Sequence, residues 1–242
     1  MTDHHLKNNI LFFRFRRQQR MTKSTREIVI PSQYLGETSE FKAGRGTLID
    51  HGKIYAKILG VLNKHPPYVN VVPLKGKYDP VEGDTIIGFV EQAMSSSWLA
   101  DINAPYPALL HVSEVPWKVE FGETEKYLNT GDAIMAKILS VDVEKKLNIT
   151  LKDRNLYKIR GGHIITVGPS KVPRIIGKKG SMINLLKKYT RCRIFVGKNG
   201  RIWIDGDDLQ VSNAVQAIRL IERESISYGL TDKVEQLLKS LS

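Results

Sequence analysis

The chain has 242 residues, of which 41% are apolar, and its formal net charge is +12. This length is enough for two or three small domains, each with its own core. The sequence has no run of 18 apolar residues and no signal-peptide pattern, so we expect a cytoplasmic protein without a membrane span. The single cysteine, Cys192, excludes an internal disulfide and a cysteine-rich metal site.

Positive charge is concentrated in two stretches of the sequence. Residues 156–206 contain 12 Lys and Arg against one acid, Asp205, and residues 1–24 contain six bases against Asp3. The stretch between them has 15 bases and 17 acids and is nearly neutral. A basic block indicates a surface that binds phosphate groups, and the affinity of such a surface falls steeply with salt.

The first 24 residues show no hydrophobic periodicity, and we interpret them as a disordered basic extension. Met21 offers a second interpretation, in which the first 20 residues are an upstream start-site artefact. Residues 25–79 alternate short apolar runs with Gly, Pro and Asp, which predicts a small β domain. Its expected strands are 28–30, 47–49, 53–59 and 68–72.

Residues 80–155 predict a closed Greek-key barrel of the OB type. Gly83-Asp84 and Gly131-Asp132 introduce the first and fourth of five short strands alike. The expected strands are 85–91, 97–102, 108–112, 133–142 and 147–151. Such barrels commonly bind single-stranded nucleic acid on one face, and a barrel that serves only as a spacer is the alternative.

Residues 156–226 predict an α+β domain with the element order β-α-α-β-β-α. The expected strands are 163–167, 192–196 and 201–205, and the last helix carries Ala214, Val215, Ile218 and Ile221 on one face. This is the order of a type I KH domain, whose GxxG loop clamps about four nucleotides of single-stranded RNA. Residues 227–242 predict a further helix with an apolar stripe, which must pack on the domain or on a neighbouring subunit.

The segment Gly177-Lys178-Lys179-Gly180 supplies the GxxG sequence of that loop. The two glycines allow a positive φ and a close approach of backbone to ligand. We expect Ser181 to be the N-cap of the following helix, which would direct free N–H groups toward a bound phosphate. Arg174 precedes this turn and is a further candidate contact to RNA. Gly197-Lys198-Asn199-Gly200 is a second GxxG, but its position predicts a hairpin turn, which has no helix N-terminus to offer.

The barrel resembles the S-one type of OB fold. The matching residues are Gly88 and Val90, Asp101-Ile102, the run Ala108 to Glu114, Gly131-Asp132, Lys137-Ile138 and Asn148 to Leu151. The resemblance places His111 on a position that faces RNA and suggests Trp98 as a second RNA contact. Leu99 and the Met94-Ser95 region stand where the module has stacking aromatics, and Asn148 stands where it has a basic residue.

Over residues 26–240 the chain resembles the RNA-binding cap subunits of the archaeal exosome. The most specific segments are Gly44 to Thr47, Gly52 to Ala56, Trp98, Ile176 to Met182 and Gly197 to Ile204. The resemblance implies a non-catalytic role: three cap subunits sit on a ring of RNase-PH-like subunits, bind single-stranded RNA and guide its 3′ end into the ring. It also implies that the N-terminal β domain contacts the ring.

Two rival interpretations follow from the same residues. A nuclease needs carboxylates that hold metal, but Asp205, Asp207 and Asp208 precede a helix and are better explained as its N-cap region. We therefore expect no catalytic residue, no metal and no cofactor. The second rival is an S-one/KH factor that acts in transcription or translation, but such factors carry two KH domains of the other strand order.

Overall fold

A computed structural model describes residues 27–142, 144 and 146–241. The chain divides into two compact units, which part between Leu74 and Lys75 and are described separately below. The extension expected for residues 1–24 lies outside the described residues. None of the helices in the described ranges is both long enough and apolar enough to cross a membrane.

The first unit consists of two small sheets around a shared apolar core. The four-stranded sheet has the order β1 (Ile28–Val29), β6 (Gly60–His65), β7 (Tyr68–Pro73) and β3 (Lys42–Ala43). The three-stranded sheet has the order β2 (Tyr34–Glu37), β5 (Lys53–Ala56) and β4 (Thr47–Asp50). The core residues are Val29, Leu35, Ile54, Ala56, Val69 and Val71.

The single strand expected over residues 53–59 is therefore wrong in its length. β5 ends at Ala56, and the chain then crosses to the other sheet, where β6 begins at Gly60. Gly60 lies opposite Pro73, and a Cβ atom at residue 60 would be 2.4 Å from the carbonyl oxygen of Val72. This close approach requires glycine at the crossing.

The second unit begins with the barrel, and all five expected strands are present. They are β8 (Thr85–Met94), β9 (Ser97–Asp101), β10 (Ala108–His111), β11 (Ala133–Val141) and β12 (Leu147–Thr150). The pairing of β11 with β12 closes the barrel, and β10 runs parallel to β12. The short strand β13 (Tyr157–Lys158) then pairs with β11 as the chain leaves the barrel.

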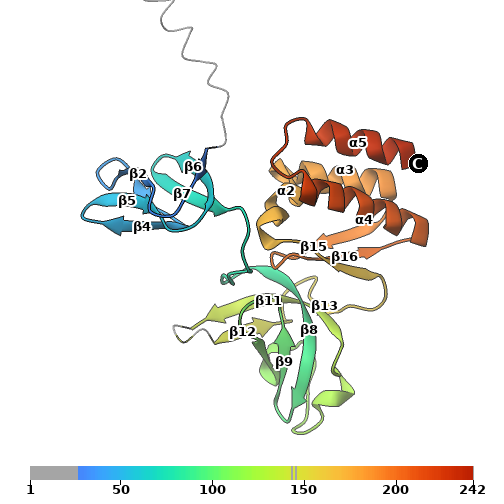
Figure 1. The fold of residues 1–242 in the computed structure, drawn as a ribbon. Coiled ribbons are helices and arrows are strands. Elements are labelled where there is room, and N and C mark those ends of the chain that lie inside the picture. The colour runs from blue at the N-terminus through green and yellow to red at the C-terminus, as the bar shows by residue number, and fades with distance from the viewer. Residues whose placement is uncertain (1–26, 143, 145, 242) are drawn as a thin grey trace, which may run out of the picture. The chain divides into compact units, whose positions relative to one another are not determined.

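The KH domain follows with the expected order of elements. They are β14 (His163–Thr166), α2 (Val172–Ile176), α3 (Ser181–Thr190), β15 (Arg193–Val196), β16 (Arg201–Asp205) and α4 (Asp208–Arg223). The sheet is antiparallel with the order β14-β16-β15, and the helices lie together on one face of it (Figure 1).

The C-terminal helix α5 (Leu230–Leu241) packs on its own KH domain, which is one of the two arrangements expected for it. Leu230, Val234 and Leu238 are buried in the same core as α3 and α4. α4 ends at Arg223, and Gly229 stands directly before α5 with φ +68°.

The other face of the KH sheet packs against the barrel. Trp203 of β16 is buried with Ile87, Met135 and Ile159, while its neighbours Ile202 and Ile204 face the helices. This alternation is the normal period of a strand, and it gives a sheet with both faces covered.

The hairpin between β15 and β16 inserts its tip into the barrel surface. The side chain of Asn199 is fully buried, and its Nδ2 donates to the carbonyl oxygens of Ile87 (2.7 Å) and Ile102 (2.8 Å). Its Oδ1 accepts from the backbone N–H of Ile87 at 3.3 Å. The second GxxG is thus a buried hairpin turn, and its glycines serve packing: a Cβ atom on Gly200 would lie 2.3 Å from the carbonyl oxygen of Val167.

Arg201 adds a charged contact beside this hairpin. Its guanidinium pairs with the carboxylate of Asp101 and donates from Nη1 to the carbonyl oxygen of the same residue at 2.6 Å. The guanidinium also lies over the ring of Phe89, 4.7 Å from the ring centroid. The barrel and the KH domain are therefore joined by hydrogen bonds, one ion pair and apolar contact together.

Replacing Asn199 should destabilise the second unit strongly. Asn199→Ala removes the side-chain donor to the Ile102 carbonyl oxygen and the acceptor of the Ile87 N–H, at about 1–3 kcal/mol for each buried group left unpaired, while the Ile87 carbonyl oxygen keeps a bond from Arg201 at 3.2 Å. Asn199→Asp would in addition place negative charge against both carbonyl oxygens. Urea unfolding followed by tryptophan fluorescence would measure the change in the free energy of unfolding. The control is Asn63→Asp, at an exposed position of β6. Equal unfolding free energies for the wild-type and Asn199→Ala proteins would contradict the importance of this contact.

Candidate nucleic-acid interface

The GxxG loop, Gly177–Gly180, joins α2 to α3 as a tight turn. Gly177 ends α2 with φ +75°, and residues 178–180 form a single 3-10 turn. α3 begins at Ser181, and the N-cap is Gly180 in the left-handed conformation, without a side-chain cap. The expectation that Ser181 caps the helix is therefore wrong, because Ser181 already has helical backbone angles (φ −58°, ψ −42°).

The two glycines of the loop are needed for different reasons. A Cβ atom on Gly177 would lie 2.6 Å from the backbone nitrogen of Met182, so a side chain there would displace the start of α3. Around Gly180 there is open space, and its nearest neighbour would be Asn184 Nδ2 at 3.6 Å. Gly180 is required only by its positive φ of +80°.

Both lysines of the loop are exposed to solvent. Lys179 holds the left-handed conformation with φ +53°. In the part of the chain that the structure describes, no acid pairs with Lys178 or Lys179. The first N–H groups of α3 have no acceptor within the helix and carry its positive dipole end. Two cations and a helix N-terminus thus meet in one exposed turn, which can bind a phosphate group.

Arg174 lies one helical turn before the loop and is half-buried. Its Nη2 donates to the carbonyl oxygen of Ser227 at 3.5 Å, in the segment between α4 and α5. The structure therefore brings residues 177–181 together as a surface, whereas the guanidinium of Arg174 holds the C-terminal segment against α2.

His111 is exposed at the end of β10, and its ring is held by Ser113. Nδ1 accepts from the backbone N–H of Ser113 at 3.1 Å and lies 2.8 Å from the Ser113 hydroxyl oxygen. When the ring is neutral, this acceptor role of Nδ1 leaves the proton on Nε2, which can then donate to a ligand. The side chain is oriented and open to solvent, as a contact to RNA requires.

The expectation that Trp98 contacts RNA is wrong. Its side chain is fully buried in the barrel core, and its Nε1 donates to the carbonyl oxygen of Leu128 at 3.0 Å. Neighbouring residues of a strand point to opposite faces, and Leu99, one residue further along β9, takes the outward position. Trp98 stabilises the barrel.

Phe121, which no sequence pattern singles out, is 84% exposed in the loop between β10 and β11. The loop is held to the turn between β8 and β9: the Gly122 N–H donates to the carbonyl oxygen of Ser95 at 2.9 Å, and the Thr124 hydroxyl donates to that of Met94 at 2.7 Å. An aromatic ring on a fixed loop is suited to stack on a base. In the sequence, Phe121 is a single phenylalanine among charged loop residues. It belongs to no periodic pattern, so the sequence gives no reason to select it.

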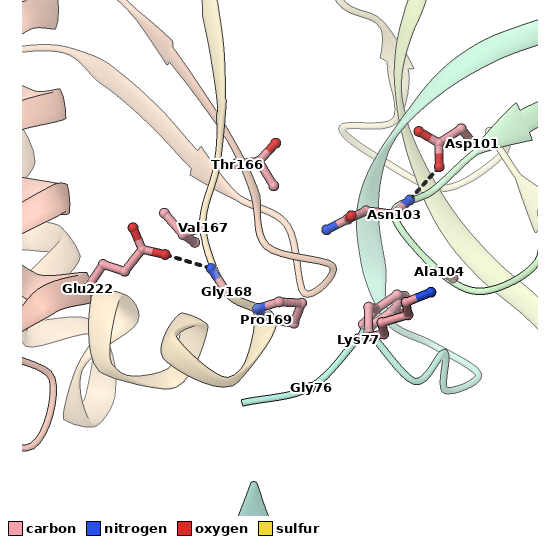
Figure 2. A pocket seen from close by; sticks show the side chains of 11 residues that line it. Gly76, Lys77, Asp101, Asn103, Ala104, Thr166, Val167, Gly168, Pro169 and Glu222 are labelled. Carbon is pink, nitrogen blue, oxygen red and sulfur yellow. Dashed lines mark hydrogen bonds between the residues drawn. The ribbon is translucent and has the colours of Figure 1, made fainter. Parts of the chain in front are cut away.

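A cavity of about 520 Å³ lies between the barrel and the KH domain within the second unit (Figure 2). Its carboxylates are engaged: Asp101 accepts from the backbone N–H of Asn103 at 2.8 Å, and Glu222 accepts from that of Gly168 at 2.8 Å. Among the described residues, no group of three His, Cys, Asp or Glu side chains is placed to hold a metal ion. We therefore interpret the cavity as part of the packing between the two domains.

Known proteins similar to this chain agree with the arrangement of its domains. Residues 26–75 match the family model "Exosome RNA binding protein RRP4 N-terminal domain", and residues 162–210 match a KH domain model. A solved structure described as that of a putative exosome complex RNA-binding protein is 34% identical, with a TM-score of 0.64, and the match covers 69% of this chain and 97% of that one.

Two curated relatives are similar over most of their length. The exosome complex component Rrp4 of Methanosarcina acetivorans is 46% identical over 215 residues, 89% of this chain and 82% of that protein. The Rrp4 of Thermoplasma volcanium is 42% identical over 218 residues, 89% of this chain and 91% of that protein. With its matched N-terminal domain, closed barrel and KH domain, this chain belongs to the Rrp4 family of exosome RNA-binding components.

Proposed function

We propose that this chain is a non-catalytic, cytoplasmic subunit that caps a ring of RNase-PH-like subunits in three copies, binds single-stranded RNA and guides its 3′ end into the ring. The observation that carries the proposal is the GxxG loop, because its exposed lysines and helix N-terminus form a phosphate site on a member of the Rrp4 family. His111, on the barrel, is a second contact to the same RNA.

The charge and surface of the two units suit different partners. The first unit exposes several large apolar side chains, among them Ile28 (52% exposed), Ile30 (60%) and Ile49 (59%). These side chains are the ones through which the first unit would contact another protein, since contiguous apolar surface marks protein-binding sites. The second unit contains the basic block of residues 156–206, which suits RNA.

A non-catalytic role is supported by how the acidic side chains near the KH domain are used. Asp205 pairs with Arg193 across neighbouring strands, and Asp207 is the N-cap residue of α4. Asp205 thus has a structural partner, and Asp207 occupies the N-cap position without a side-chain hydrogen bond to the helix. RNA degradation by the complex would then be the work of the ring.

Replacing two residues of the first unit should separate ring binding from RNA binding. Ile30→Glu with Ile49→Glu places two charges on exposed apolar surface and should abolish co-elution with RNase-PH-like ring subunits in size-exclusion chromatography. RNA affinity of the isolated chain should remain unchanged. Tyr228→Glu, at a position of the second unit that is 77% exposed, is the matched control. Co-elution of the double variant with the ring at wild-type yield would refute the docking surface.

Gly180→Asp should weaken RNA binding while the domain stays folded. Space around residue 180 is open, and aspartate tolerates the left-handed conformation better than most residues, so the main effect is a negative charge beside the phosphate site. Gly180→Asn has the same shape without the charge and is the control. Fluorescence anisotropy with labelled RNA should show a larger decrease in affinity for Asp than for Asn. Equal affinities of the two variants would argue against a phosphate at this loop.

Replacing both loop lysines by glutamine should lower the affinity for all RNA sequences alike. Each phosphate of single-stranded RNA that a lysine neutralises adds about 0.7 to the slope of log affinity against log salt, so the slope of the double variant should be smaller by about 1.4. Binding titrations at several salt concentrations measure this slope. Lys42→Gln with Lys53→Gln, both exposed in the first unit, is the control. A decrease in affinity for one RNA sequence alone would mean that Lys178 and Lys179 read bases.

A further inference from the structure

The exposed face of α3 carries a row of polar and basic side chains that begins at the GxxG loop. Met182, Leu186 and Thr190 are buried, and the opposite face of the helix is exposed. The residues of this row, spaced three or four apart, are Ser181, Asn184, Lys187, Lys188 and Arg191. Residues separated by three or four positions lie side by side on a helix, so the row leads from the loop to three cations at the far end.

These three cations, Lys187, Lys188 and Arg191, are called here the basic end of α3. The helix has ten residues and is therefore about 15 Å long. It contains no acid, and the sequence between Gly168 and Ile204 contains none either. Across the described ranges, no ion pair involves any of the three cations.

A carboxylate from α5 comes near the basic end but already has partners. Glu235 accepts from the Tyr189 hydroxyl at 2.7 Å and pairs with Lys239 at 3.0 Å. These two contacts hold the pKa of the Glu235 carboxyl below its usual value. The carboxylate is thus engaged mainly by Tyr189 and Lys239 and only weakly by the charge of Lys188. In the described part of the chain it forms no ion pair with the basic end, whose positive charge remains available to an external anion.

The backbone at Arg191 gives a second, independent observation. Arg191 follows α3 in the left-handed conformation (φ +54°, ψ +11°), and its N–H donates to the carbonyl oxygen of Lys187 at 2.9 Å. Glycine is the usual residue at this position because it adopts a positive φ without strain. Attraction to the helix dipole favours a cation anywhere in the last turn, so it does not require an arginine at the strained residue.

The same combination occurs at the other end of the helix. Lys179, in the GxxG loop, is also an exposed cation with a positive φ. Strained residues of this kind are concentrated at functional sites. An exposed cation in the left-handed conformation therefore stands just before α3 and another just after it.

We propose that Lys187, Lys188 and Arg191 form a second phosphate-binding surface, which extends the RNA path from the GxxG loop along the exposed face of α3. This rests on the proposed function, because the ligand is the same single-stranded RNA. The loop would hold about four nucleotides, as KH loops do, and the basic end would bind the backbone of the nucleotides beyond them.

The test compares short and long RNA on one set of variants. Wild-type protein and the variant Lys187→Gln, Lys188→Gln, Arg191→Gln are titrated with labelled RNA of about four and about twelve nucleotides over a range of salt. Affinity for the short RNA should be unchanged. For the long RNA, the slope of log affinity against log salt should fall by about 2, since each of three contacts contributes about 0.7.

The control variant removes the same charge elsewhere. It is the triple variant Lys42→Gln, Lys53→Gln, Lys57→Gln, whose three lysines are exposed in the first unit. Both titrations should be unchanged in this variant. The proposal would be overturned if the two triple variants lost affinity for the long RNA equally. It would also be overturned if the salt slopes for the long RNA were equal in the wild-type protein and the basic-end variant. If wild-type protein bound neither RNA, the proposed function itself would fail.

Arg191→Gly separates stability from binding. Glycine relieves the strained backbone, so the midpoint of thermal unfolding should be equal or higher, while affinity for the long RNA should fall. A lower midpoint together with unchanged long-RNA affinity would show that Arg191 is kept for structure, and would refute its assignment to the RNA path.

Discussion

The second unit depends on the burial of one amide side chain, Asn199, against backbone groups of the barrel. Buried carbonyl and N–H groups must have partners, and here the partners of Ile87 and Ile102 come from a hairpin more than 90 residues further along the chain. Without the other, the hairpin and this edge of the barrel would each have buried polar groups that lack these hydrogen-bond partners. The ion pair of Arg201 with Asp101 and the apolar contacts of Trp203 strengthen the same junction. The KH domain is consequently held on the barrel as a fixed body.

This junction determines which surfaces of the KH domain are open. One face of the sheet is covered by the barrel and the other by the helices, and α5 covers a further side of α3 and α4. The GxxG loop and the outward face of α3, where the cations lie, are among the surfaces that remain exposed. The apolar faces of the KH domain are buried by this packing, so many of the basic residues of 156–206 lie together on the exposed surface.

The two units differ in the physical character of what they expose. The first unit has a small core of six buried residues and keeps several large apolar side chains at its surface. The second unit has larger apolar cores, and its GxxG loop and the outward face of α3 expose lysines and arginines, although single apolar side chains such as Phe121 and Tyr228 are exposed elsewhere on it. Apolar surface favours a protein partner and cationic surface favours RNA, which is what the role proposed for this chain, between RNA and a protein ring, would require.

Local patterns in the sequence were sufficient for the element order of the KH domain, the GxxG loop, the five barrel strands and α5, because periodicity and glycine placement are properties of neighbouring residues. Contacts between distant residues decided the rest. Trp98 is buried because barrel closure turns its side of β9 inward, and the strand expected over 53–59 ends at Ala56 because the chain changes sheets there. Asn199 looks like any turn residue in the sequence, and only the barrel, which supplies the carbonyl groups that it binds, makes it the link between the two domains.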